Sequence, residues 1–229
     1  MTSSKWHALG NTYLLVERAE LTPERVRELV GDADGILEVA VTGPDTADVT
    51  IWNPDGSQAE MSGNGTRIAA RWLAERNGVE RVRLAVGPRV VEGRMLEGGL
   101  VETDLGEVEV YEPERVAGLE VIPVSVGNPH AVVVGDPDDL PLIGPLLETH
   151  PRFPERTNVQ VARLDEPGQV TARVWERGVG ETTASGTSAV AVAAALRQSP
   201  AQVRFPGGVL DVRFDGRRAF LTGAAERTE

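Results

Sequence analysis

The residues best able to carry chemistry lie together in the stretch 176–187, whose sequence is ERGVGETTASGT. The stretch holds carboxylates, an arginine and several hydroxyls, separated by glycine and alanine. The apolar run AVAVAAAL at 189–196 follows directly. A glycine-rich polar turn that leads into an apolar helix is typical of a helix N-terminus that binds a small anion.

A second stretch, EMSGNGTR at 60–67, has the same features. Apolar residues follow it at helical spacing between 68 and 73, and Gly78 supplies a stop signal. If the two turns face each other they form one site, and the other elements must position them.

Length and composition describe an acidic globular protein. The 229 residues are sufficient for one large domain or two lobes. The net charge of −12 argues against nucleic acid or an anionic membrane as a partner, because both require a basic surface. The absence of cysteine excludes disulfides and thiol nucleophiles. We expect no metal site, since the histidines His7, His130 and His150 are widely spaced.

No apolar run approaches the length of a membrane span, and the first residues lead into no signal-like apolar core. We therefore expect a cytoplasmic protein.

Both halves of the chain show the same order of short strands, one glycine-initiated helix and further strands. Apolar or alternating runs predict strands at 13–16, 36–41, 48–52, 82–86, 90–91, 100–103 and 108–110, and again at 119–126, 131–134, 158–162, 170–175, 203–205, 209–212 and 219–221. This repetition predicts an α+β protein of two similar lobes, residues 1–114 and 115–229.

The helices carry clear signals. Thr22 and Pro23 are expected to be the N-cap and first residue of a short helix, and a second helix is expected over 140–149. The segment 188–197 has no polar face, which predicts a helix buried within a sheet. The helix that follows the turn at 60–67 is expected to have a solvent-exposed face, made of Arg67, Arg71, Glu75 and Arg76.

Six motifs in series resemble diaminopimelate epimerase, an amino-acid epimerase that works without pyridoxal phosphate. They are HALGN at 7–11, NPDGS at 53–57, EMSGNG at 60–65, GNPH at 127–130, TNV at 157–159 and the stretch 176–187. Each motif is weak alone, but together they follow the order of the family over nearly the whole chain. The resemblance implies two pseudo-symmetric lobes, each with a mixed or antiparallel sheet wrapped around a central helix. It also allows the last strand to return to the first lobe.

In that family each glycine turn presents a cysteine, and the two cysteines exchange a proton with Cα on opposite faces of the substrate. Ser62 and Ser185 occupy these positions here. An alkoxide is much harder to form than a thiolate, since a free thiol titrates near ~8.5. Catalysis by these serines therefore requires an activating neighbour, for which His130, Glu176 and Glu181 are the candidates.

Two other interpretations of the serine pair stay open. Both residues can be ordinary helix N-caps, a position at which serine is common. They can also be engineered replacements in a cysteine enzyme, because the change is symmetric.

The resemblance further implies a set of substrate-binding residues. Arg177 would bind a substrate carboxylate, and the backbone amides at both turns would bind the carboxylate of the reacting centre. The full set is Asn11, Asn53, Gly63, Asn64, Asn128, Asn158, Glu176, Arg177, Gly186 and Thr187. Any one of the asparagines alone would also suit a turn. The segment 28–35 is shorter than in the family, which leaves open any contact that this loop supplies there.

Three functions are compatible with these features. The first is epimerisation of a diaminopimelate-like amino acid, as part of lysine biosynthesis, with activity reduced or lost through the serines. The second is a catalytically silent protein that binds such an amino acid. The third is a related isomerase that uses a carboxylate base, for which Glu60 is the candidate. In each case we expect a small amino acid as partner and no cofactor, and a homodimer stays open.

Overall fold

The structure is a computed structural model that describes residues 2–18, 20–59 and 61–228. The chain forms two compact units, one of Met1–Asp104 with Thr222–Glu229 and one of Leu105–Leu221. The C-terminal segment therefore belongs to the same unit as the first hundred residues. Among the described residues, no helix is long and apolar enough to span a membrane.

The first unit is a sheet with two helices. Its elements are β1 (Thr2–Ala8), β2 (Asn11–Glu17), α1 (Pro23–Leu29), β3 (Gly35–Val41), β4 (Thr46–Trp52), β5 (Gln58–Ala59), α2 (Gly63–Asn77), β6 (Arg81–Val86), β7 (Arg89–Met95), η1 (Glu97–Gly99), most of β8 (Leu100–Glu107) and β19 (Glu226–Arg227). The strands β19, β1, β2, β3, β4, β6, β7 and β8 are neighbours in that order. All of these pairs are antiparallel except β2–β3 and β4–β6, and β5 pairs with β4.

The second unit has the same architecture. Its elements are β9 (Glu109–Val110), β10 (Glu114–Val116), β11 (Leu119–Ser125), β12 (Pro129–Val134), η2 (Pro137–Asp139), α3 (Leu140–Glu148), β13 (Asn158–Glu166), β14 (Gln169–Glu176), β15 (Gly180–Thr182), α4 (Gly186–Ala195), β16 (Ala201–Phe205), β17 (Gly208–Asp215) and most of β18 (Arg218–Ala224). The strands β9, β11, β12, β13, β14, β16 and β17 are neighbours in that order, with β12–β13 and β14–β16 as the parallel pairs.

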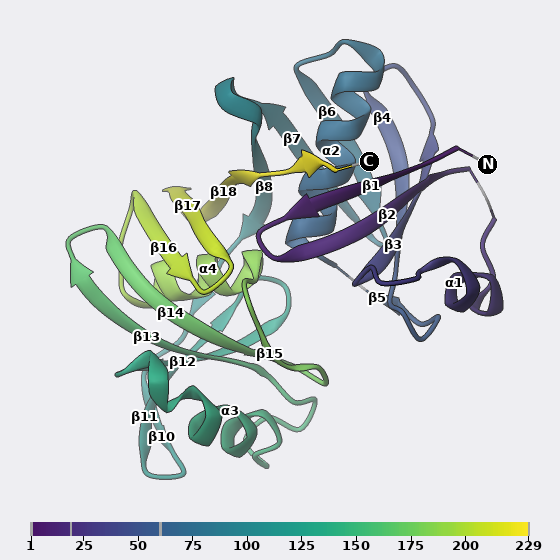
Figure 1. Cartoon of the computed structure of the whole chain (residues 1–229). Coiled ribbons are helices and arrows are strands. Elements are labelled where there is room, and N and C mark those ends of the chain that lie inside the picture. Colours follow the sequence, from purple (N-terminus) through teal and green to yellow (C-terminus); the bar gives the residue numbers. More distant parts are fainter. Residues whose placement is uncertain (1, 19, 60, 229) are drawn as a thin grey trace. The chain divides into compact units, whose positions relative to one another are not determined.

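The two units repeat one topology, in which β1 to β7 correspond to β11 to β17, and α2 corresponds to α4 (Figure 1). Strand register extends this correspondence to single residues. Tyr13 lies opposite Gly35 in the β2–β3 pair, as His130 lies opposite Asn158 in β12–β13. The predicted fold class, two similar α+β lobes, is confirmed.

Helix α2 begins and ends as its sequence predicts. Ser62 is the N-cap in an extended conformation, and Gly78 ends the helix with a φ of 67°, which glycine adopts without a steric penalty. The helix packs against β1, β2, β3, β4, β6 and β7 (Figure 1). Its residues Ile68 and Leu73 are fully buried.

The prediction of a solvent-exposed face on α2 is wrong at one position. Arg67 is fully buried (0% exposed), whereas Glu75 and Arg76 are exposed. The side chain of Arg67 folds back over the first helical turn, where the Asn64 amide and the Gly63 carbonyl accept its hydrogen bonds. The polar partners of this buried charge are thus local to the helix.

Helix α4 confirms the prediction of a buried helix. All residues from 186 to 193 are buried, and the helix contacts β11, β12, β13, β14, β16 and β17. Because alanine, valine and glycine surround its axis, strands can approach it from every side.

Strand β1 was not predicted. The strand includes the first two residues of the HALGN motif, since it extends to Ala8, and Leu9 and Gly10 form the turn that follows, both with positive φ. The polar residues at the start of β1 concealed its alternation, which buries Trp6 and Ala8.

Candidate functional site

Two clusters of polar side chains form at the N-termini of α2 and α4, one in each unit. The first cluster consists of Asn11, Tyr13, Ser62, Asn64 and Arg67. The second consists of Asn128, His130, Asn158, Gln160, Glu176, Arg177, Ser185 and Thr187.

Among the described residues, the hydroxyl of Ser62 in the first cluster has two hydrogen-bond partners. Its Oγ accepts a hydrogen bond from the backbone N–H of Gly65 at 3.0 Å, which caps α2. The same atom lies 2.9 Å from the phenol oxygen of Tyr13 on β2, and either hydroxyl can donate. Ser62 is therefore a helix cap that also contacts an acid–base group.

Asn64 connects two other polar side chains of the first cluster, those of Asn11 and Arg67. Its Nδ2 donates to Oδ1 of Asn11 at 2.6 Å, and its Oδ1 accepts from Arg67. Burial lowers the pKa of Arg67 from its usual value to about 10, against the opposing effect of Tyr13, so the guanidinium is charged at neutral pH. The predicted binding residues Asn11 and Asn64 thus lie together over a buried cation.

Asn53, by contrast, is held within its own turn. Its Nδ2 donates to Ser57 Oγ at 2.9 Å, and its backbone N–H donates to the Ser57 carbonyl at 2.8 Å. A substrate contact by Asn53 stays a prediction.

Ser185 differs from Ser62 although it has the same place in the repeat. It precedes α4 in an extended conformation, but its side chain makes no capping hydrogen bond. Its hydroxyl instead hydrogen-bonds the carboxylate of Glu176 at the end of β14, which also accepts from Thr182 Oγ1 at 2.6 Å. Burial raises the pKa of Glu176, and these two hydrogen bonds oppose the rise.

His130 does not hydrogen-bond either serine in the structure. Its Nε2 lies 3.0 Å from Asn128 Oδ1, and its Nδ1 lies 3.0 Å from Nε2 of Gln160, which is the donor of that pair. This pattern places the ring proton on Nε2. Burial lowers the pKa of His130 to about 3, with a further contribution from the charge of Arg177, so the ring is neutral.

Asn128 and Thr187 repeat the contact that Asn11 and Asn64 make in the first cluster. Asn128 Nδ2 donates to Thr187 Oγ1 at 3.5 Å. In both units, therefore, an asparagine next to the start of a strand reaches the first turn of a helix. Asn11 at the start of β2 reaches α2, and Asn128, just before β12, reaches α4.

Arg177 is positioned through its backbone. Its N–H donates to Asn158 Oδ1 at 3.0 Å, and Asn158 Nδ2 donates to the Pro129 carbonyl at 2.9 Å. The guanidinium contacts the carbonyl of Glu155 at 3.4 Å and remains half-exposed. Asn158 is buried, so its geometry supports a role in holding Arg177.

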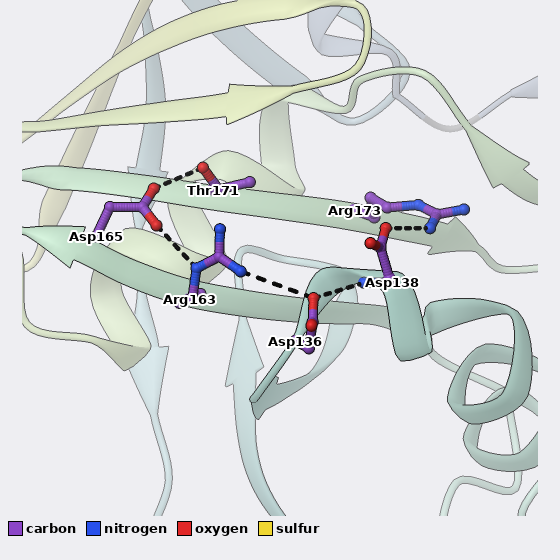
Figure 2. A network of polar contacts seen from close by, with 6 residues as sticks. All are labelled: Asp136, Asp138, Arg163, Asp165, Thr171 and Arg173. Atoms are coloured by element: carbon purple, nitrogen blue, oxygen red, sulfur yellow. Dashed lines mark hydrogen bonds and ion pairs between the residues drawn. The ribbon is translucent and has the colours of Figure 1, made fainter.

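Glu181 belongs to a surface ion network rather than to the second cluster. Its carboxylate accepts from Arg173 Nε at 2.7 Å. Arg173 also pairs with Asp138 at 3.1 Å, at one end of the network in Figure 2. The rest of the network consists of Asp136, Arg163, Asp165 and Thr171, which join η2 to β13 and β14 (Figure 2).

Sequence reasoning missed Tyr13, Arg67 and Gln160. Nothing local to Tyr13 marks it, and only the strand register shows that it is the counterpart of His130. The candidate base Glu60 lies outside the described residues.

Comparison with known families decides the relationship. The sequence profile of a family described as "Diaminopimelate epimerase" matches residues 3–110 and 122–228. This chain belongs to the diaminopimelate epimerase family. The match includes all six motifs on which the resemblance rests, so the predicted family is confirmed.

Comparison with individual proteins supports the same family relationship. The diaminopimelate epimerase of Synechocystis sp. is 36% identical to this chain over 272 residues, covering 99% of this chain and 96% of that protein. A phenazine biosynthesis protein of the PhzF family from Bacillus anthracis superposes with a TM-score of 0.76 at 13% identity, covering 99% of this chain and 96% of that one. A hydroxyproline epimerase from Agrobacterium vitis gives a TM-score of 0.67 at 16% identity, with 99% and 88% covered. At these identities the two solved structures indicate the shared fold alone.

Proposed function

We propose that this protein epimerises a diaminopimelate-like amino acid at Cα by proton transfer between two bases, without a cofactor. Membership of the diaminopimelate epimerase family supports the reaction class. The observation that carries the proposal is that each of the two equivalent serine hydroxyls contacts an acid–base side chain. Tyr13 contacts Ser62, and Glu176 contacts Ser185. We expect the reaction to serve lysine biosynthesis.

In the Ser185–Glu176 pair, the carboxylate compensates for the weak basicity of the serine hydroxyl. As Ser185 Oγ takes the proton from Cα, the Glu176 carboxylate takes the hydroxyl proton, so a full alkoxide never forms. Because burial raises the pKa of Glu176, its carboxylate is a stronger base than that of an exposed glutamate.

The helix N-termini supply the electrostatic part of the reaction. The first backbone N–H groups of α2 and α4, at Gly63, Asn64, Gly186 and Thr187, are suited to bind the carboxylate beside the reacting carbon. The same groups stabilise the negative charge that develops when Cα loses its proton.

Arg177 is the group proposed to bind the distal carboxylate. Asn158 fixes its backbone, while the guanidinium stays accessible. A guanidinium can bind a carboxylate with two parallel hydrogen bonds, which favours a diamino-dicarboxylate over an amino acid with an apolar side chain. Asn11, Asn53 and Asn128 complete the proposed binding set. The neutral His130 contributes by holding Asn128.

A silent amino-acid-binding protein is the second candidate. The observation in its favour is that Ser62 caps α2 in the ordinary way, through the N–H of Gly65 at 3.0 Å. A carboxylate-base isomerase has no comparable support, because its candidate base Glu60 lies outside the described residues.

The deciding experiment incubates the purified protein with L,L- and meso-diaminopimelate in D2O. An epimerase incorporates deuterium at Cα and interconverts the two stereoisomers, as mass spectrometry and chiral chromatography would record. Binding by calorimetry without deuterium uptake would support the silent binder instead. Neither binding nor exchange would contradict both candidates.

A further inference from the structure

The hydroxyl of Tyr13 is directed at Ser62 from the middle of β2. The side chain is buried at 8% exposure, and its oxygen lies 2.9 Å from Ser62 Oγ, which also accepts the Gly65 N–H. A serine oxygen has one proton and two lone pairs. When Ser62 donates to Tyr13, it therefore retains one lone pair that can accept a further proton.

The place of the Tyr13 ring depends on a glycine. A Cβ atom at Gly35, the partner of Tyr13 in the β2–β3 pair, would lie 2.9 Å from Cε1 of Tyr13. The equivalent position in the second unit is Asn158, whose side chain holds Arg177 instead. In the first unit the absence of a side chain at Gly35 thus leaves room for the ring of Tyr13. In the second unit the equivalent position carries the side-chain amide of Asn158.

A buried positive charge lies close to this hydroxyl pair. Arg67 is fully buried and interacts electrostatically with Tyr13. The groups that accept its hydrogen bonds, Gly63 O and Asn64 Oδ1, are neutral. A buried guanidinium favours negative charge on the groups around it.

We propose that Tyr13 is a positioning residue that relays protons through Ser62, an inference that rests on the proposed epimerase function. In one direction Ser62 Oγ takes the proton from Cα while its own hydroxyl proton moves to the phenolate oxygen of Tyr13. The C–H electron pair stays on carbon. In the other direction the phenol proton moves to Ser62, and Ser62 protonates the carbanion.

This relay makes the two serines chemically different. Ser62 works with a phenol and Ser185 with a carboxylate, although they are equivalent in the repeat. Loss of the Tyr13 hydroxyl therefore affects one stereoisomer more than the other. The isomer deprotonated through Ser62 loses exchange. The isomer deprotonated through Ser185 still forms its carbanion, but the proton returns from the same side.

The test compares Tyr13→Phe with Tyr111→Phe in the D2O assay. The chain has two tyrosines, and Tyr111 is exposed in the other unit, where its hydroxyl donates to Glu109. We expect Tyr13→Phe to slow interconversion by roughly 10²-fold, with deuterium exchange lost from one stereoisomer and retained without inversion in the other. The control should match the unaltered protein.

A second measurement leaves the shape of the side chain nearly unchanged. In the Tyr111→Phe background Tyr13 is the sole tyrosine, so biosynthetic incorporation of fluorotyrosine makes only this phenol more acidic. A relay predicts that fluorination changes the ratio of the two exchange rates, whereas a purely structural hydroxyl predicts an unchanged ratio.

The outcomes separate the two proposals. If the unaltered protein exchanges deuterium, but Tyr13→Phe lowers both stereoisomers equally or not at all and fluorination has no effect, the relay is wrong and the epimerase stands. If the unaltered protein exchanges no deuterium, the proposed function is wrong and the relay falls with it.

Discussion

The indole N–H of Trp175 donates to Glu148 Oε2 at 2.7 Å and so ties the end of β14 to the end of α3. The other carboxylate oxygen of Glu148 accepts the backbone N–H of Gly178 at 2.7 Å. Because Gly178 follows Arg177, this one buried carboxylate holds the turn that presents the proposed carboxylate-binding arginine. Trp52, the counterpart of Trp175, likewise donates its indole N–H to a glutamate, Glu38, at 2.9 Å.

We predict that Glu148→Gln destabilises the protein by about 1–3 kcal/mol, because an amide N–H2 group would face a backbone or indole donor. Urea unfolding would measure the loss, with Glu120→Gln on the exposed side of β11 as the matched control. We also expect weaker calorimetric binding of diaminopimelate, since the Arg177 turn loses its anchor. Equal stability of the two variants would contradict this account.

The same residue predicts a pH dependence of stability. Burial raises the pKa of Glu148, but hydrogen bonds from Gly178 and Trp175 and the charge of Arg156 outweigh it, so the pKa lies below its usual value. A depressed pKa means that the stabilisation is complete above the unfolded value of about 4.3 and is lost as pH falls through the folded value. Glu148→Gln should remove this part of the acid dependence of unfolding. If unfolding of Glu148→Gln depended on acid pH as strongly as unfolding of the unaltered protein, Glu148 would not be the source of this dependence.

Glu176 predicts the acid limb of the proposed reaction. For the stereoisomer that is deprotonated through Ser185, the carboxylate of Glu176 must be ionised to act as a base, and burial raises its pKa. The rate should therefore fall, as pH decreases, at a pH above the ordinary glutamate value of about 4.3. Glu176→Gln should slow exchange by roughly 10²-fold and abolish this limb. Glu166→Gln, at the exposed end of β13, should keep both the rate and the limb.

Restoring thiols at the two serine positions should increase activity. A thiol titrates near ~8.5, and a helix N-terminus lowers that value further, so a thiolate forms where an alkoxide does not. We expect Ser62→Cys/Ser185→Cys to speed Cα deuterium exchange by roughly 10²-fold. Ser3→Cys, an exposed serine on β1, controls for an added thiol. A double variant that binds diaminopimelate but exchanges no faster would exclude weak basicity of the serines as the limit.

Gly144 in α3 gives a prediction about packing. A Cβ atom there would lie 2.8 Å from Cβ and Cγ of Trp175, the indole that binds Glu148. Gly144→Ala should therefore cost about 1–3 kcal/mol of unfolding free energy, as over-packed cores do. Gly135→Ala places its Cβ no closer than 3.8 Å to Val161 and should be nearly neutral in the same urea titration. Similar midpoints for the two variants would mean that α3 shifts freely.

The sequence by itself determined the local structure and the family. Thr22 and Pro23 start α1, Ser62 and Gly78 bound α2, and the apolar run that begins at Ala189 forms most of the buried α4. These signals act within one or two helical turns, so they can be recognised without knowledge of the rest of the chain. The repetition of strands and turns was visible for the same reason.

Tertiary structure alone decided what each serine contacts. Tyr13 and Ser62 are 49 residues apart, and they meet because β2 pairs with β3 in a register that sets Tyr13 beside Gly35. Arg67 is buried because the sheet encloses the first turn of α2, which helical periodicity does not reveal. Hydrogen bonds between distant segments depend on strand register and on the space left by neighbouring side chains. Those quantities are fixed only when the whole unit packs.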